Sequence, residues 1–379
     1  MKKVLKLLKR IMIVFLSIVV ILVIAVALYM QHPKFGANPS GARLEKLKTS
    51  PNFKDGSFVN RSYTPSLTEG YSMGKVMFNF LFRKPKGTTP TGIIPSVRTD
   101  LKNLPAGNWL AWFGHSSYFI QADGLKLLVD PIFSGNASPI PGSTKAFKGS
   151  DVYSVEDLPE IDYVFISHDH YDHLDYQTMQ QLKGKVKKVI CGLGVGAHLE
   201  RWGYAPADII EMDWDTDVQL QQGAKVFGLT TRHFSGRSFK RDQTLWMAYL
   251  LQTPKRKIYI GGDGGFDKHF AAIGALHGPI DLAILENGQY NEAWKAIHFL
   301  PGENLQAAVD LKARRLMPVH SGKFDLAMHD WDEPLNEMDR LDQTVGIPLV
   351  TPVIGELVNL DDTAQVFSKW WKEVDPKLP

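Results

Sequence analysis

The sequence predicts an α/β fold in which two β-sheets pack together and helices cover their outer faces. From Asn108 onward, short runs rich in β-branched and aromatic residues alternate with segments of helical periodicity. The first runs follow one another directly, as the strands of hairpins do, whereas helical segments separate the later runs. This order is typical of two packed sheets with external helices.

The chain begins with a basic segment and then an apolar one. Ile11–Met30 is a run of twenty residues without charge, and at about 1.5 Å per residue such a run spans the hydrocarbon core of a bilayer. A buried core helix or a signal peptide are the alternatives. We expect an uncleaved transmembrane anchor, because the run is long and Ala27–Pro33 is a poor cleavage site.

The charges beside this run predict its orientation. Residues 1–10 hold five basic residues and no acid, which favours a cytoplasmic N-terminus and a single-pass protein of the cell membrane with an extracytoplasmic body. Lys34, Arg43, Lys46 and Lys48 lie beyond the run and reduce this asymmetry.

The composition of the body limits its function. Hydrophobic residues make up 44% and charged residues 22% of the chain, a balance that excludes a disordered protein. One cysteine excludes a disulfide scaffold and a zinc site built from several thiolates. Without the five basic residues of the N-terminus, 38 basic and 40 acidic residues remain, so nucleic acid is not expected as a partner.

We divide the chain into a basic n-region (1–10), an anchor (11–30), an extended segment that wraps the core with little regular structure (31–107), a main domain (108–360) and a tail (361–379). The tail could contain a short helix within Thr363–Val374. The predicted strands are Trp109–Phe113, Lys126–Val129, Tyr163–Ile166, Lys188–Cys191, Lys225–Thr230, Leu245–Leu251, Lys257–Ile260, Leu282–Leu285 and Arg315–Pro318. The predicted helices are Tyr176–Lys183, Val195–Trp202, Asp267–Leu276 and Glu303–Ala313.

Histidine and aspartate residues gather directly after the predicted strand Tyr163–Ile166. His168 and His170 are two apart in extended chain and therefore point to the same side. Asp172 and His173 follow where the chain turns into a helix. Imidazole and carboxylate ligands packed in this way suit two neighbouring metal ions better than a polar loop of hydrogen-bonded histidines.

The motif H-x-H-x-D-H after a strand resembles the metallo-β-lactamase superfamily, whose fold is an αββα four-layer sandwich with a dinuclear metal site at strand ends. His233, Asp263 and His320 each follow a predicted strand and match the remaining ligands of that family. The resemblance covers about Asn108–Val358 and implies two zinc ions. One would be held by His168, His170 and His233, the other by Asp172, His173 and His320, with Asp263 bridging both. Such a metal pair activates water for attack on phosphorus or a carbonyl.

Further motifs are similar to the N-acylphosphatidylethanolamine-hydrolysing phospholipase D branch and its bacterial relatives. They are Trp112–Ser117, Asp130-Pro131, Arg232–Ser235 with Arg241 and Thr244–Trp246, Arg314–His329 and Trp331–Pro334. One departure is Gly264-Gly265-Phe266, where Asp-Thr-Gly-Tyr is the commoner form after the bridging aspartate. The ascorbate-6-phosphate lactonase branch shares the ligand set but has no need of a membrane anchor.

The resemblance also indicates candidate catalytic and substrate-binding residues outside the set of metal ligands. It places a substrate-contacting histidine at His298, and Tyr290 and His329 are further candidates for substrate binding. Packed, hydrogen-bonded histidines are the alternative at positions 298 and 329. Asp172, Asp263 and His298 are the candidate catalytic residues. We expect His115 to be structural, Cys191 to lie in the core, and the cluster Arg237, Lys240 and Arg241 either to receive phosphate or to form a solvated face.

We therefore expect a membrane-anchored, zinc-dependent phosphodiesterase acting on an N-acyl phosphatidylethanolamine-type phospholipid. Attack on phosphorus would release the N-acylethanolamine and leave phosphatidic acid. One alternative is a hydrolase of a soluble ester, lactone or cyclic phosphodiester on the same metals. The other is a non-catalytic metal-binding membrane protein, for which a bridging aspartate has no use. The oligomeric state stays open.

Overall fold

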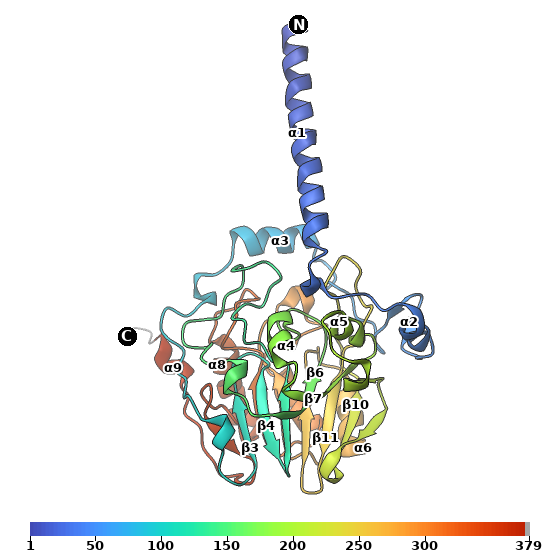
Figure 1. Ribbon diagram of the computed structural model, residues 1–379. Coiled ribbons are helices and arrows are strands. Elements are labelled where there is room, and N and C mark those ends of the chain that lie inside the picture. Colours follow the sequence, from blue (N-terminus) through green and yellow to red (C-terminus); the bar gives the residue numbers. More distant parts are fainter. Residues whose placement is uncertain (376–379) are drawn as a thin grey trace.

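The computed structural model describes residues 1–375. A long helix, α1 (Lys2–Tyr29), projects from the body of the molecule (Figure 1). The structure describes every residue of α1, and none of their side chains is buried in protein. By length and composition α1 is able to cross a membrane.

The first of the two large sheets contains the early strands of the main domain. Within residues 1–375 its order is β15-β3-β4-β5-β6-β7-β8. Strands β15 to β5 pair antiparallel, and β5 to β8 pair parallel. The strands are β3 (Trp109–Trp112), β4 (Tyr118–Ala122), β5 (Leu125–Val129), β6 (Ile161–Ile166), β7 (Val186–Gly192), β8 (Ile209–Met212) and β15 (Leu357–Asn359).

The second sheet contains the later strands. In the part of the chain that the structure describes, its order is β14-β13-β12-β11-β10-β9. Strands β9 to β12 pair antiparallel, and β12 to β14 pair parallel. The strands are β9 (Asp217–Gln219), β10 (Lys225–Leu229), β11 (Ala248–Gln252), β12 (Lys257–Ile260), β13 (Leu282–Glu286) and β14 (Leu316–Val319).

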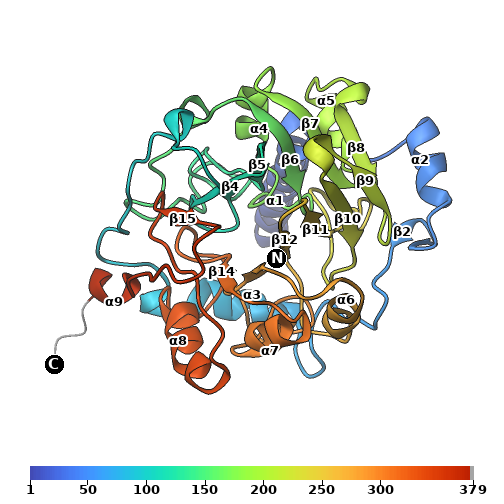
Figure 2. The same ribbon diagram turned by 90° about the horizontal axis from the view of Figure 1, so that it is seen from below.

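The two sheets pack face to face through a buried apolar core. The ring of Phe165 on β6 lies 5.2 Å from that of Tyr249 on β11, and the Tyr249 hydroxyl donates to the carbonyl oxygen of Ile166. Helices cover both outer faces (Figure 2). Those beside the first sheet are α4 (Tyr176–Leu182) and α5 (Gly196–Arg201), and those beside the second are α6 (His269–His277), α7 (Glu303–Asp310) and α8 (Glu333–Val345). The predicted αββα sandwich is confirmed.

The segment before the main domain is more regular than the sequence suggested. It contains α2 (Gly41–Lys48), a short hairpin of β1 (Phe53–Lys54) and β2 (Ser57–Phe58), and α3 (Met73–Phe82). The prediction of little regular structure between residues 31 and 107 is corrected. α2 is held by the main domain, because Arg43 forms ion pairs with Glu200 at 2.8 Å and Glu211 at 3.1 Å.

Further differences concern single elements. The elements β4, β8, β9, β15 and α8 were not predicted, and the strand expected over Leu245–Leu251 begins only at Ala248. The strand starts late because residues 245–247 bond to loops of the first sheet instead. The amide of Leu245 donates to the carbonyl oxygen of Leu193, and the amide of Met247 donates to that of Ser167. In the tail, α9 covers Trp371–Val374 rather than the whole of Thr363–Val374. Residues 376–379 of that tail lie outside the described residues.

Candidate metal centre

The candidate ligands come from loops at one end of both sheets. His168, His170, Asp172 and His173 follow β6, and His233 lies beyond the end of β10. Asp263 follows β12, and His320 follows β14 directly. Because parallel strands end at the same edge, loops far apart in sequence meet there.

Three imidazoles form the first group. His168 Nε2 lies 2.8 Å from His170 Nδ1, and the same His170 nitrogen lies 3.3 Å from His233 Nε2. Burial lowers the pKa of each of these histidines below its usual value. Neutral imidazoles whose nitrogen atoms face one another can bind a metal ion.

The second group combines imidazoles with a carboxylate. His173 Nε2 lies 3.5 Å from Oδ2 of Asp172, and the ring of His320 lies 5.2 Å from that of His173. His115 joins this group, since its Nε2 lies 2.9 Å from the same Asp172 oxygen. Through this contact His115 orients the Asp172 carboxylate. This agrees with the structural role that the sequence suggested for His115.

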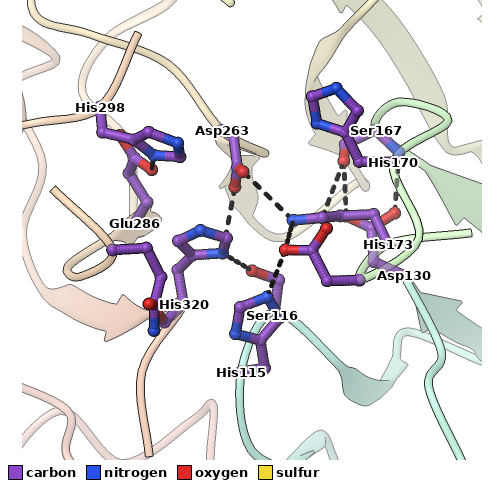
Figure 3. Close-up of polar contacts among 12 residues, drawn as sticks. His115, Ser116, Asp130, Ser167, His170, His173, Asp263, Glu286, His298 and His320 are labelled. Atoms are coloured by element: carbon purple, nitrogen blue, oxygen red, sulfur yellow. Dashed lines mark hydrogen bonds and ion pairs between the residues drawn. The ribbon is translucent and has the colours of Figure 1, made fainter. Parts of the chain in front are cut away.

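Asp263 contacts both groups, and Figure 3 shows its carboxylate directed at His173 and His320. Its Oδ2 atom is 3.2 Å from His173 Nε2, 3.9 Å from His168 Nε2 and 3.8 Å from His233 Nε2. Its Oδ1 atom is 3.2 Å from His320 Nδ1. One carboxylate therefore faces imidazoles of both groups.

Two buried polar atoms at the middle of this arrangement indicate whether the site could bind metal ions. His173 Nε2 and Asp263 Oδ1 are buried and make no hydrogen bond within residues 1–375. Leaving such atoms unsatisfied costs about 1–3 kcal/mol each. Metal coordination would satisfy both, and the imidazole and carboxylate donors are those that zinc and iron accept. The residues present therefore fit a pair of metal ions.

A second layer of residues fixes the imidazole rings. Asp130 Oδ2 lies 2.8 Å from His173 Nδ1 and accepts a hydrogen bond of 2.6 Å from Ser167 Oγ, which in turn lies 3.0 Å from His168 Nδ1. Each contact engages Nδ1 and leaves Nε2 directed to the centre, as in many metal sites. The sequence indicated Asp130 only as part of a family motif. Its position directly after the apolar strand β5 was the available signal.

His298 lies beside the centre, and a buried carboxylate holds it. Nδ1 of His298 lies 2.6 Å from Glu286 Oε2, and its ring lies 5.1 Å from His233 and 5.4 Å from His320. Burial raises the pKa of Glu286 to about 7. Burial alone would lower the pKa of His298, but the carboxylate outweighs it and raises the pKa to about 9. Sequence reasoning missed Glu286, although an acid at the end of the apolar strand β13 was a visible signal.

Tyr290 and His329 lie together, outside the His and Asp groups. Their rings are 4.5 Å apart, and the Tyr290 hydroxyl donates to Glu333. His329 Nε2 accepts from the Gln289 amide, and its Nδ1 lies 2.8 Å from the Asp330 carbonyl oxygen. Protein groups thus occupy the polar atoms of both side chains, and the Tyr290 ring is buried, so only the half-buried His329 ring could touch a substrate.

The basic cluster divides into a buried and an exposed part. Arg237 is buried and donates to the carbonyl oxygens of Asp169, Leu174 and Lys34, so it is neither solvated nor free for phosphate. Arg241 lies over the ring of Phe234, 4.0 Å from its centre. It lines a cavity of about 370 Å³ that also contains His233, Asn60 and Trp246. Arg241 is therefore better placed than Arg237 to meet an anionic substrate.

The Gly264-Gly265 sequence allows other loops to pack closely on the bridging position. A Cβ atom at residue 264 would collide with Oγ1 of Thr231, which donates to the Asp263 carbonyl oxygen. A Cβ atom at residue 265 would collide with the backbone of Ala296, next to the loop that carries His298. The departure from the commoner motif thus matches the packing around Asp263.

Residues 126–321, which include every candidate ligand, match the family model described as the Beta-lactamase superfamily domain. The chain belongs to the metallo-β-lactamase superfamily. It is a metal-dependent hydrolase of that superfamily, as the resemblance of the motifs implied.

Similar proteins of this superfamily cover most of the chain. An uncharacterized protein of Mycobacterium tuberculosis is 34% identical over 91% of this chain and 94% of its own length. N-acyl-phosphatidylethanolamine-hydrolyzing phospholipase D 1 of Caenorhabditis elegans is 26% identical over 71% of this chain and 80% of its own length. Among solved structures, a metallo hydrolase from Ignicoccus hospitalis superimposes with a TM-score of 0.52 at 20% identity, covering 66% of this chain and 97% of the archaeal one. This last likeness concerns the fold alone.

Proposed function

We propose that this protein is a membrane-anchored, zinc-dependent phosphodiesterase that hydrolyses an N-acyl phosphatidylethanolamine-type phospholipid in the manner of a phospholipase D. The proposal rests above all on Asp263, whose carboxylate faces imidazoles of two separate groups. This arrangement supports two metal ions, held by His168, His170 and His233 and by Asp172, His173 and His320, with Asp263 shared. Such a pair, when bound, supplies Lewis acidity and activated water for an in-line displacement at phosphorus.

Residues around the ligands suit a phosphodiester substrate. Arg241 offers a guanidinium to a phosphate oxygen at the mouth of the cavity that reaches His233. Glu286 engages Nδ1 of His298, so Nε2 is the ring atom left to contact the substrate. A histidine held in this way can donate a hydrogen bond from Nε2 to the oxygen that leaves with the N-acylethanolamine. The His329 ring, which packs against the buried Tyr290, would contribute apolar surface to the substrate site.

The link between anchor and site supports a substrate that stays in the membrane. The Lys34 carbonyl oxygen, five residues after the end of α1, accepts a 2.7 Å hydrogen bond from Arg237. Arg237 also binds the Asp169 carbonyl oxygen, between the ligands His168 and His170. The anchor therefore enters the body next to the metal-binding loop. We place the body outside the cytoplasm because of the basic residues before α1.

The proposal is tested with purified full-length protein and phospholipid vesicles. N-Acyl phosphatidylethanolamine is supplied in water enriched in ¹⁸O, and the products are identified by mass spectrometry. We expect N-acylethanolamine and phosphatidic acid, with the heavy oxygen in the phosphatidic acid because water attacks phosphorus. Asp263→Asn protein is the control. Hydrolysis of soluble lactones or esters without release of N-acylethanolamine would instead favour the alternative hydrolase, and no turnover by metal-loaded protein on any of these would contradict the proposal.

A further inference from the structure

A second apolar helix lies beside the base of α1. α3 (Met73–Phe82) has the sequence MGKVMFNFLF, and no side chain of this fully described helix is buried. Figure 1 shows α3 lying crosswise on the end of the body from which α1 projects, and Figure 2 shows the two helices as neighbours.

The exposed side chains of α3 are mostly large and apolar. Five of them face solvent, in two rows with a spacing of four residues: Met73, Met77 and Leu81, and Phe78 and Phe82. Phe82 is 72% exposed. Val76 and Phe80 lie half-buried on the side toward the body. A helix that is apolar around most of its circumference is normally covered by protein or by lipid, because water solvates it poorly.

Loops around the end of α1 expose apolar residues as well. The Tyr29 hydroxyl at the end of α1 donates to the Pro139 carbonyl oxygen, and the next residue, Ile140, is exposed. Phe239 is 88% exposed, two residues after the Arg237 that binds the chain leaving α1. Exposed apolar side chains thus occur both on α3 and on two loops at this end of the body.

The charges of α3 and its flanks are basic. Lys75 lies in the helix and Arg83 and Lys86 follow it, all exposed, and residues 73–82 contain no acid. Basic side chains beside an apolar helix are attracted to lipid phosphates while the apolar residues enter the acyl region.

We propose that α3 is an interfacial helix that lies in the surface of the same bilayer that α1 spans. Continuity with the apolar α1 and the basic flanks favour this occupant over a second copy of the chain. The chain on either side of α3 contacts two loops, one that leads to His298 and one that follows His320. Thr68 Oγ1 donates to the Glu292 carbonyl oxygen at 2.7 Å, and Lys84 forms an ion pair with Asp325 at 2.7 Å. α3 therefore holds the end of the body that carries the metal centre against the lipid. The inference and its quenching test rest on the proposed anchor, and only the measurement of lipid turnover rests also on the proposed function.

Depth-dependent quenching tests the inference. Met77→Cys and Phe82→Cys proteins are labelled with an environment-sensitive fluorophore, to which the buried native Cys191 is inaccessible. Full-length labelled protein is reconstituted into vesicles of phosphatidylethanolamine and phosphatidylglycerol, with and without brominated acyl chains. Leu276→Cys is the matched control, because Leu276 is 78% exposed on α6, at the opposite end of the body. We expect brominated lipid to reduce fluorescence at positions 77 and 82 by about half and to leave position 276 unchanged.

Each other outcome overturns the inference in a distinguishable way. If the protein floats with the vesicles but the labels at positions 77 and 82 are not quenched, α3 does not lie in the bilayer, although α1 still anchors the protein. Cross-linking between the introduced thiols of two copies, without quenching, would assign this face to a dimer. Protein that does not float would remove the anchor as well. As a second measurement, Leu81→Ser with Phe82→Ser should lower turnover of vesicle lipid about tenfold and spare a soluble phosphodiester, whereas Leu276→Ser should change neither.

Discussion

Glu286 accepts two hydrogen bonds at the edge of the metal centre, one from Nδ1 of His298 at 2.6 Å and one from the amide of Phe299 at 2.8 Å. The carboxylate thereby fixes the ring of His298 and the start of the chain that follows it. Because Glu286 ends β13, which pairs with β12 on one side and with β14 on the other, a strand inside the second sheet holds the histidine.

We expect Glu286→Gln to lower turnover about 10- to 100-fold while both metal ions stay bound, since outer-shell partners of this kind have effects of that size. Steady-state kinetics and elemental analysis on the same preparation measure the two quantities. Glu292→Gln is the matched control, because Glu292 is exposed on a neighbouring loop. If Glu286 acts through His298, the double variant with His298→Ala loses no more activity than His298→Ala alone. Additive losses would contradict this relationship.

Asp263→Asn tests the bridging position. The substitution keeps the size of the side chain but removes the charge that two metal ions would share. Turnover should fall at least about 100-fold, and the second equivalent of metal should bind more weakly. Asp267→Asn, on the same loop, is the control. Full metal content with near-normal turnover in Asp263→Asn would show that this carboxylate does not bridge.

Metal content and removal form a third test. Protein never exposed to chelator should carry close to two equivalents of zinc or a similar ion, because seven ligand side chains exceed the three or four that one zinc takes. Removal should lower the thermal unfolding midpoint, since it leaves buried atoms such as His173 Nε2 without a partner. Re-addition of metal should restore both the midpoint and activity. Elemental analysis that gives one equivalent or none would exclude the dinuclear centre.

The buried Arg237 provides a prediction about stability. Its guanidinium binds three carbonyl oxygens from two distant segments. Arg237→Ala should lower the free energy of unfolding by about 2–4 kcal/mol, measured by denaturation in detergent, because it leaves these acceptors unsatisfied. Arg241→Ala, at an exposed position, should change it by less than about 0.5 kcal/mol. If the two substitutions lowered the free energy of unfolding equally, the structural role of Arg237 would be contradicted.

The orientation of the anchor is tested by protease accessibility. If residues 1–10 are cytoplasmic, protease added to spheroplasts should cleave the body. Protection in spheroplasts with cleavage after lysis would reverse the orientation. Edman sequencing of the membrane-bound protein shows whether α1 is retained, as an uncleaved anchor requires.

Local patterns determined much of what was expected. Apolar runs of strand length and the H-x-H-x-D-H motif depend on neighbouring residues, so they identify the strands, the αββα fold and the superfamily without any knowledge of distant contacts. The four candidate ligands from His168 to His173 were visible for the same reason. The elements β4, β8, β9, β15 and α8 were missed although they are local, and α3 was missed because its apolar residues lie in a segment whose Gly, Pro and Ser content favoured little regular structure.

Only the tertiary structure decided how distant residues meet. Asp130 behind His173, Glu286 behind His298, and Arg237 between Lys34 and Asp169 are contacts between segments 12 to 203 residues apart. These contacts arise from the order of the strands and from the meeting of several loops at one edge of the sheets. Local sequence patterns do not encode either feature. The same holds for surfaces. Whether the apolar residues of α3 form a core or face outward depends on what packs against them, and in the structure the body covers only part of the side that carries Val76 and Phe80.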